Sequence, residues 1–139
     1  MAVNMALTHK AKLLFVYVLE PLIPERMSTA YVYFPPTLLD ESNIQDITEI
    51  KGKIQKRMIE FCQKEPDIDA LPGGGPEYHI IEGAPAASIV KTAEKMHADL
   101  IVMGSHTHGV LDTLLVGSVA NKVVNHSTKP VFLVPVKRN

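Results

Sequence analysis

Four short apolar runs alternate with segments of helical character along this chain, and this alternation restricts the possible folds more than any other feature. The runs cover residues 12–18, 77–81, 99–103 and 131–136. The first run is almost continuously hydrophobic, which is typical of a strand that is covered on both faces, as in a parallel sheet. The alternation therefore predicts an α/β fold, with a doubly wound, mainly parallel sheet and helices on both faces.

The longest helix is expected over residues 43–64. Its apolar side chains recur at steps of three and four residues and form one stripe, made of Ile44, Ile47, Ile50, Ile54, Met58 and Phe61. Gly52 lies within this helix and is a weak point of roughly 1 kcal/mol relative to alanine. Shorter helices are expected over residues 2–9, after Pro85 and from Val119 onward.

The composition indicates a small chain with balanced charge. Its 139 residues include 14 basic and 15 acidic side chains and no tryptophan. Balanced charge argues against a nucleic-acid partner or an anionic membrane surface. The lone Cys62, which we expect in the core or half-buried, cannot form an internal disulfide; this suits a reducing cytoplasm. We therefore expect one cytoplasmic domain over residues 1–139, with neither nucleic acid nor membrane as a partner.

A glycine-containing loop joins the third apolar run to the last helix. Gly104 follows the strand directly, and Gly117 and Ser118 precede the helix that continues from Val119. The N-terminus of a helix offers unpaired N–H groups and the positive end of the helix dipole, so this junction is suited to hold a phosphate. The alternative is that both glycines only form tight turns and that Ser118 is an ordinary N-cap. The spacing alone does not separate these two interpretations.

Two familiar nucleotide motifs are missing from the sequence. No GxxxxGK[ST] run occurs, which excludes a Walker-type ATPase, and no GxGxxG follows a strand. A phosphate site in the loop would therefore use backbone N–H groups, with the Ser118 hydroxyl as a further donor.

Four segments carry a combined pattern: Glu82-Gly-Ala-Pro-Ala, Ala98-Asp-Leu-Ile-Val-Met-Gly-Ser-His, Leu115-Val-Gly-Ser-Val-Ala and Lys129-Pro-Val-Phe-Leu-Val. In this combination the chain resembles the universal stress protein family. The similarity extends back through residues 14–21 and leaves out only the variable middle region, 22–76. It implies a Rossmann-like fold, similar to that of the adenine-nucleotide alpha hydrolases, with a five-stranded sheet. It also implies a homodimer that pairs through the last strand, from Val131 to Val136.

The resemblance implies a nucleotide site as well. Family members that bind ATP share the pattern Gly-x2-Gly-x9-Gly-Ser/Thr, which Gly104 and the pair Gly117-Ser118 match here. Thr107 replaces the middle glycine, and Gly109 follows two positions later; a β-branched residue disfavours positive φ. The remaining implied contacts are to adenine, from Val18 and Met103, and beside the phosphates through the backbone, from Ser105 and Val119. The expected ligand is ATP with Mg²⁺.

The N-terminus departs from the family pattern. The family begins with a strand that carries an Asp, which contacts the base or ribose, whereas this sequence begins at Ala2 within the helix that follows. That strand would lie between the strands 13–18 and 100–103. We therefore expect an interrupted sheet and a site that lacks one wall, unless another segment or a partner chain fills the position.

Other reactive side chains suggest weaker sites. His106 and His108 lie in the loop, and His126 and Asp112 could be added to them as metal ligands, but two loop histidines are more typical of a solvated or phosphate-adjacent position, so no metal site is predicted. Ser118 lacks an activating base, so no catalytic residue is assigned and at most slow ATP hydrolysis is expected. The predicted function is an ATP-binding stress-response regulator. The alternative, a dimeric interaction module without nucleotide, is favoured by Thr107 and the absent strand.

Overall fold

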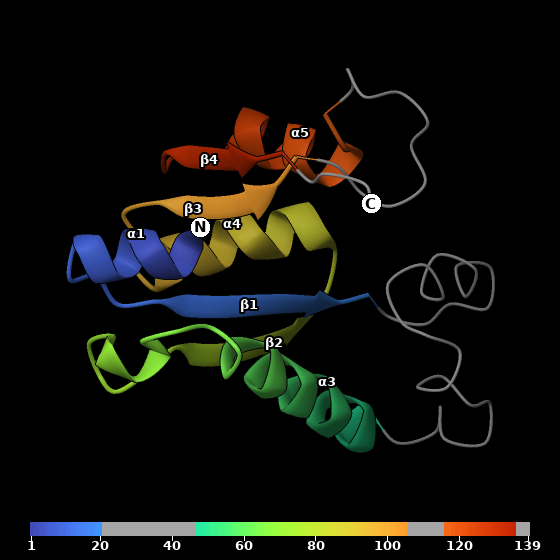
Figure 1. The fold of residues 1–139 in the computed structure, drawn as a ribbon. Coiled ribbons are helices and arrows are strands. Elements are labelled where there is room, and N and C mark those ends of the chain that lie inside the picture. Colours follow the sequence, from blue (N-terminus) through green and yellow to red (C-terminus); the bar gives the residue numbers. More distant parts are fainter. Residues whose placement is uncertain (21–46, 106–115, 136–139) are drawn as a thin grey trace. The chain divides into compact units, whose positions relative to one another are not determined.

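The computed structural model describes residues 1–20, 47–105 and 116–135, and the elements alternate as the sequence predicts (Figure 1). In chain order they are α1 (Ala2–Thr8), β1 (Leu14–Leu19), α3 (Ile47–Cys62), the short 3₁₀ helix η4 (Ile68–Ala70), β2 (Glu77–Glu82), α4 (Pro85–Lys95), β3 (Ile101–Gly104), α5 (Ser118–His126) and β4 (Val131–Val134). The predicted α/β class, with helices between parallel strands, is therefore confirmed.

The four strands form two separate pairs, β1 with β2 and β3 with β4. Strands β3 and β4 are parallel, in a register that runs from Ile101 opposite Val131 to Gly104 opposite Val134. In the part of the chain that the structure describes, no strand is hydrogen-bonded to both pairs.

The hydrogen bonds at the two ends of the β1–β2 pair indicate that these strands are parallel too. The Glu77 amide donates to the Leu13 carbonyl over 2.9 Å, and the Gly83 amide donates to the Leu19 carbonyl over 3.0 Å. Because both bonds join residues with the same separation along the sequence, the two strands run in the same direction.

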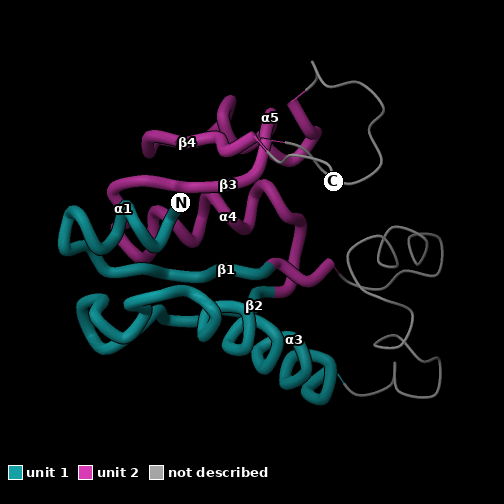
Figure 2. The backbone as a smooth tube through the Cα atoms, viewed as in Figure 1, with its two compact units in different colours: residues 1–17, 21–81 teal, residues 18–20, 82–139 magenta. Residues whose placement is uncertain are grey.

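Residue contacts divide the chain into two compact units, residues 1–17 with 21–81 and residues 18–20 with 82–139 (Figure 2). The core of the first unit joins α1, the end of α3 and the turn around η4. Its buried members are Val3, Ala6, Cys62, Ile68 and Leu71, with Leu7, Leu13, Phe15 and Tyr78 packed against them. Tyr78 interacts with Cys62, and partial burial together with this hydrogen bond raises the pKa of Tyr78 to about 12.

The apolar stripe of α3 ends on a different residue from the one predicted. Ile50, Ile54, Met58 and Cys62 are buried, whereas Phe61 is 60% exposed and Ile47 is 43% exposed. Steps of four residues rotate the buried face by about 40° each, because a helix has about 3.6 residues per turn. By the fourth turn this drift brings Cys62 into the core and leaves Phe61 outside it. The prediction for Cys62 is thus confirmed and the ones for Ile47 and Phe61 are wrong, while Ile44 lies outside the described residues.

In the second unit, α4 and α5 pack with β3 and β4 around a small apolar core. Ala93, Ile101 and Val123 are buried in it, and the side chains packed against them are Ala86, Ile89, Val90, Ala98, Met103, Val119 and Val131. Helix α4 begins with Pro85 at its first position, as predicted. In the described residues no helix combines the length and the apolar character needed to cross a bilayer.

Candidate functional site

The carboxyl end of β3 is joined to β4 one residue beyond the strand itself. The backbone N–H of Ser105 donates to the Val134 carbonyl over 2.9 Å, which extends the ladder between the two strands. Ser105 is a polar residue with only 8% of its surface exposed. The preceding Gly104 is exposed, so the chain emerges from the sheet at this point.

The start of α5 lies directly against the same residue. The Gly117 N–H donates to the Ser105 carbonyl over 2.7 Å, and the Gly117 carbonyl accepts the first helical hydrogen bond, from Asn121, over 2.9 Å. Gly117 is the N-cap of the helix and is itself buried. The structure therefore brings Gly104 and Ser105 together with Gly117 and Ser118, although ten or more residues separate them in sequence.

Three amides remain at the beginning of α5. The first N–H groups of a helix have no acceptor within it, and here these belong to Ser118, Val119 and Ala120. Val119 packs against the core of the unit and Ala120 is buried, whereas Ser118 is exposed. The two apolar side chains thus anchor the first turn to the sheet. With the positive end of the helix dipole, this arrangement is suited to an anion of the size of one phosphate group.

The backbone conformation of Gly117 bears on the alternative interpretation of the loop. Its φ of −56° and ψ of 153° are open to any residue. Gly104 is not among the described glycines with positive φ, which are Gly73, Gly74, Gly75 and Gly83. A tight left-handed turn is therefore not the reason for glycine at either position.

The capping part of that alternative is wrong. The N-cap is Gly117 and not Ser118, and no side chain caps the helix. The first turn of α5 consequently keeps its amides without a competing side-chain acceptor from the cap, which is the role that serine or aspartate usually fills.

The two residues assigned to an adenine pocket lie on different strands. Val18 is half-buried in β1, and Met103 in β3 packs against the core around Ile101 and Val123. Met103 therefore has the core role that its residue type alone indicates, and its contact with adenine stays a prediction. Thr107 and Gly109 lie outside the described residues, as do His106, His108 and Asp112.

No metal centre marks another site in the described part of the chain. No cluster of three or more His, Cys, Asp or Glu side chains in that part could hold a metal ion. The ring of His126 is engaged by its own helix, because Nδ1 lies 2.8 Å from the Lys122 carbonyl oxygen.

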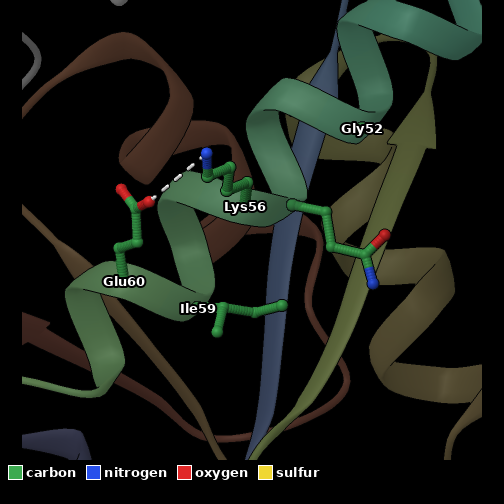
Figure 3. Close-up of a pocket in the computed structure, with 5 residues that line it drawn as sticks. Gly52, Lys56, Ile59 and Glu60 are labelled. Atoms are coloured by element: carbon green, nitrogen blue, oxygen red, sulfur yellow. Dashed lines mark ion pairs between the residues drawn. The ribbon is translucent and has the colours of Figure 1, made fainter.

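An open depression of about 390 Å³ lies along the surface of α3, far along the sequence from the loop (Figure 3). Its described lining comes from this helix alone: Gly52, Gln55, Lys56, Ile59 and Glu60. Lys56 and Glu60 face each other across it with 4.0 Å between Nζ and Oε1. Both side chains are largely exposed, so this pair contributes little to stability.

Sequence reasoning did not find the link between the site and the last strand. Ser105 was singled out only through the family resemblance, and Val134 was not singled out as its partner. The parallel pairing expected between the strands 99–103 and 131–136 could have suggested this link, because parallel neighbours end at the same edge of a sheet. The pairing alone does not give the register, and the register decides which carbonyl accepts from the Ser105 N–H.

Comparison with known proteins assigns a family to this chain. A model described as the universal stress protein family matches residues 1–135. Over 134 residues, the sequence is 29% identical to the universal stress protein YxiE of Bacillus subtilis, covering 96% of this chain and 85% of that one.

Solved structures show the same fold. UspA from Lactobacillus plantarum superposes with a TM-score of 0.63 at 20% identity, covering 96% of this chain and 83% of its own. A universal stress protein in complex with cAMP superposes with a TM-score of 0.54 at 22% identity, covering 98% and 86%. The family match spans nearly the whole sequence and agrees with the observed order of helices and strands, so this chain belongs to the universal stress protein family.

Proposed function

We propose that this protein is a small cytoplasmic stress-response regulator that binds ATP with Mg²⁺, and that the Gly104–Ser118 loop holds the phosphates. The observation that carries the proposal is the junction of β3 with α5. There the Gly117–Ser105 hydrogen bond sets an uncapped helix N-terminus against the carboxyl end of a parallel strand. The edge formed by the carboxyl ends of parallel strands is where open α/β sheets bind ligands.

The chemical nature of the site favours a phosphate ligand. The donors offered by α5 are main-chain amides of Ser118, Val119 and Ala120, and an amide donates well to an anionic oxygen. A protein of the same fold has been solved with cAMP, an adenine nucleotide, which supports this class of ligand. Because no residue is proposed as a general base, we expect ATP to act as a bound signal that is hydrolysed slowly at most.

The proposal includes a homodimer that pairs through β4 and its continuation from Val131 to Val136. Within the described residues β4 pairs with β3 alone, and Phe132 on β4 is 40% exposed. A second copy that adds its last strand would cover this side chain. Sedimentation analysis tests the arrangement, and a monomer at micromolar concentration would contradict it.

Ser118 offers a direct test of the proposed contact. Proline is favoured at the first position of a helix, and the ψ of 153° at Gly117 is the extended value that a following proline requires. Ser118→Pro should therefore keep the helix but remove one N–H donor, and Ser118→Ala should remove only the hydroxyl. A hydrogen bond to a charged group contributes roughly 1.5–3 kcal/mol, so Ser118→Pro should weaken Mg-ATP binding by about tenfold or more.

Calorimetric titration of Mg-ATP and of cAMP into the three proteins is the measurement. If wild type and Ser118→Pro bind Mg-ATP equally, the first-turn amide is not part of the site. If the folded wild type binds neither nucleotide, the proposed function fails. The alternative, an interaction module of the same fold that does not bind nucleotide, would then be supported.

A further inference from the structure

The main chain of Ser105 forms two hydrogen bonds, one through its carbonyl and one through its N–H. Its carbonyl accepts from the Gly117 N–H, at the start of α5, and its N–H donates to the Val134 carbonyl, at the end of β4. The bonds are 2.7 and 2.9 Å long, and both lie at a residue that is almost fully buried. The start of α5 and the end of β4 are thus held by the same residue, and neither is bonded to the other at this point.

A second set of contacts joins the same elements at a different place. Val123 of α5 is fully buried, and Val131 of β4 packs into the same apolar core. This contact fixes the body of the helix on the strand, whereas the Ser105 bonds fix the helix N-terminus. The two Ser105 bonds therefore connect the first turn of α5 with the last pairing of β4.

We infer that the main chain of Ser105 couples the anion site to strand β4, so that ligand binding at α5 and attachment of β4 stabilise one another. The inference rests on the proposed function, because it concerns regulation of that site. A ligand bound to the first turn of α5 holds the Gly117 N–H on the Ser105 carbonyl. This in turn keeps the Ser105 N–H bonded to the Val134 carbonyl. By linkage, anything that secures β4, such as another strand paired with it, tightens ligand binding by the same factor.

The conformation of Gly117 provides a variant that breaks only one of the two bonds. Its φ of −56° is within the range that proline adopts, so Gly117→Pro fits the backbone while it removes the N–H that donates to Ser105. Gly117→Ala is the matched control: it also adds a side chain but keeps the N–H. The reporter is hydrogen exchange of the Ser105 amide, measured by NMR, because this amide forms the other bond, to Val134.

In the ligand-free proteins, we expect the Ser105 amide to exchange faster in Gly117→Pro than in Gly117→Ala. Equal rates in two folded variants would overturn the coupling, whatever the ligand proves to be. In the wild type, saturating Mg-ATP should slow exchange at Ser105 by about fivefold or more, the lower end of ordinary allosteric coupling.

A second comparison does not depend on either Gly117 variant. Val131→Ala weakens β4 without altering the proposed phosphate donors, and Val3→Ala is the same truncation in the core of the first unit. Val131→Ala should lower the affinity for Mg-ATP under conditions in which the protein is fully folded, and Val3→Ala should not.

The outcomes separate the inference from the proposed function. If the wild type binds Mg-ATP but exchange at Ser105 is unchanged, the coupling is wrong and the nucleotide site stands. If the wild type does not bind Mg-ATP, the nucleotide site is wrong, and the ligand-free exchange rates still decide whether Ser105 links α5 to β4.

Discussion

Two of the described junctions lead from a strand through glycine into a helix, and the backbone angle requires glycine at only one of them. Between β2 and α4, Gly83 adopts a φ of +149°, and a Cβ on it would lie 2.7 Å from the Ser88 hydroxyl oxygen. At the start of α5, Gly117 adopts a φ of −56°, which any residue tolerates. The backbone angle and the contact with Ser88 both require glycine at the first position. At the second position the backbone angle does not require it.

The helices that follow these two glycines also differ in the backbone amides that their first turns offer. Helix α4 has Pro85 at its first position, so one of the amides that a ligand could use is missing. Helix α5 has no proline in its first turn, so the amides of Ser118, Val119 and Ala120 are all present; neither helix has a side-chain cap. A glycine-containing strand-to-helix junction is therefore not evidence for a binding site by itself; the backbone angle and the first helical residue distinguish the two cases.

The largest expected effect is that of a negative charge at Gly117. Asp and Asn are both good N-caps and have nearly the same shape, so Gly117→Asp and Gly117→Asn should both keep α5 folded. The carboxylate should repel the phosphates and abolish measurable Mg-ATP binding in calorimetry. The amide should leave weaker but detectable binding. Equal affinity of the Asp variant and the wild type would remove this residue from the site.

A smaller effect is expected at the other junction, and on stability instead of binding. Gly83→Ala places a Cβ at a backbone angle that is essentially restricted to glycine and should lower the free energy of unfolding by about 2 kcal/mol. The double variant Gly83→Ala/Ser88→Ala removes the contact with the hydroxyl but not the unfavourable φ, so it should recover only part of the loss. Urea denaturation measures both, and a fully recovered double variant would show that only the contact matters.

Gly52, in the middle of α3, extends the comparison to a glycine that neither its backbone angle nor its surroundings require. A Cβ on it would meet nothing within 4 Å, and its φ is not positive. Gly52→Ala should raise the free energy of unfolding by about 1 kcal/mol through helix propensity alone. The same urea titration measures the change. A destabilised variant would contradict this expectation and would indicate that a side chain at position 52 is unfavourable in the open depression along α3.

The smallest effect is expected from Pro85→Ala, which restores the missing amide of α4. The change should cost less than about 1 kcal/mol of stability, mainly through the greater freedom of the unfolded chain. It should not alter the calorimetric affinity for Mg-ATP. A new binding event in this variant would mean that an available amide is enough to form a site and that the contrast between the two junctions is mistaken.

Much of this fold follows from local patterns in the sequence. The alternation of apolar runs and helical segments identified the α/β class, and Pro85 was placed correctly because proline fits the first turn of a helix. The end of the α3 stripe was not predicted, because the choice between Phe61 and Cys62 depends on how the helix rotates over four turns and on what packs beneath its last turn.

The candidate site was predictable in outline but not in detail. Gly117 and Ser118 could be placed at a helix start, yet only the structure shows that the N-cap is Gly117 and that its N–H is already bonded to Ser105. Such a bond depends on tertiary geometry between residues that are distant in sequence. For the same reason the pairing of Ser105 with Val134 could not be derived from the residues alone.

The burial of Cys62 gives this protein an internal probe of opening. It is the single cysteine of the sequence, 2% exposed, in the core of the first unit and not in the unit that contains α5 and the proposed nucleotide site. A thiol reagent can reach it only when that core opens, so the labelling rate measures a local opening equilibrium. Labelling with and without nucleotide would therefore reveal whether a ligand held by one unit is felt in the other, without introducing any substitution.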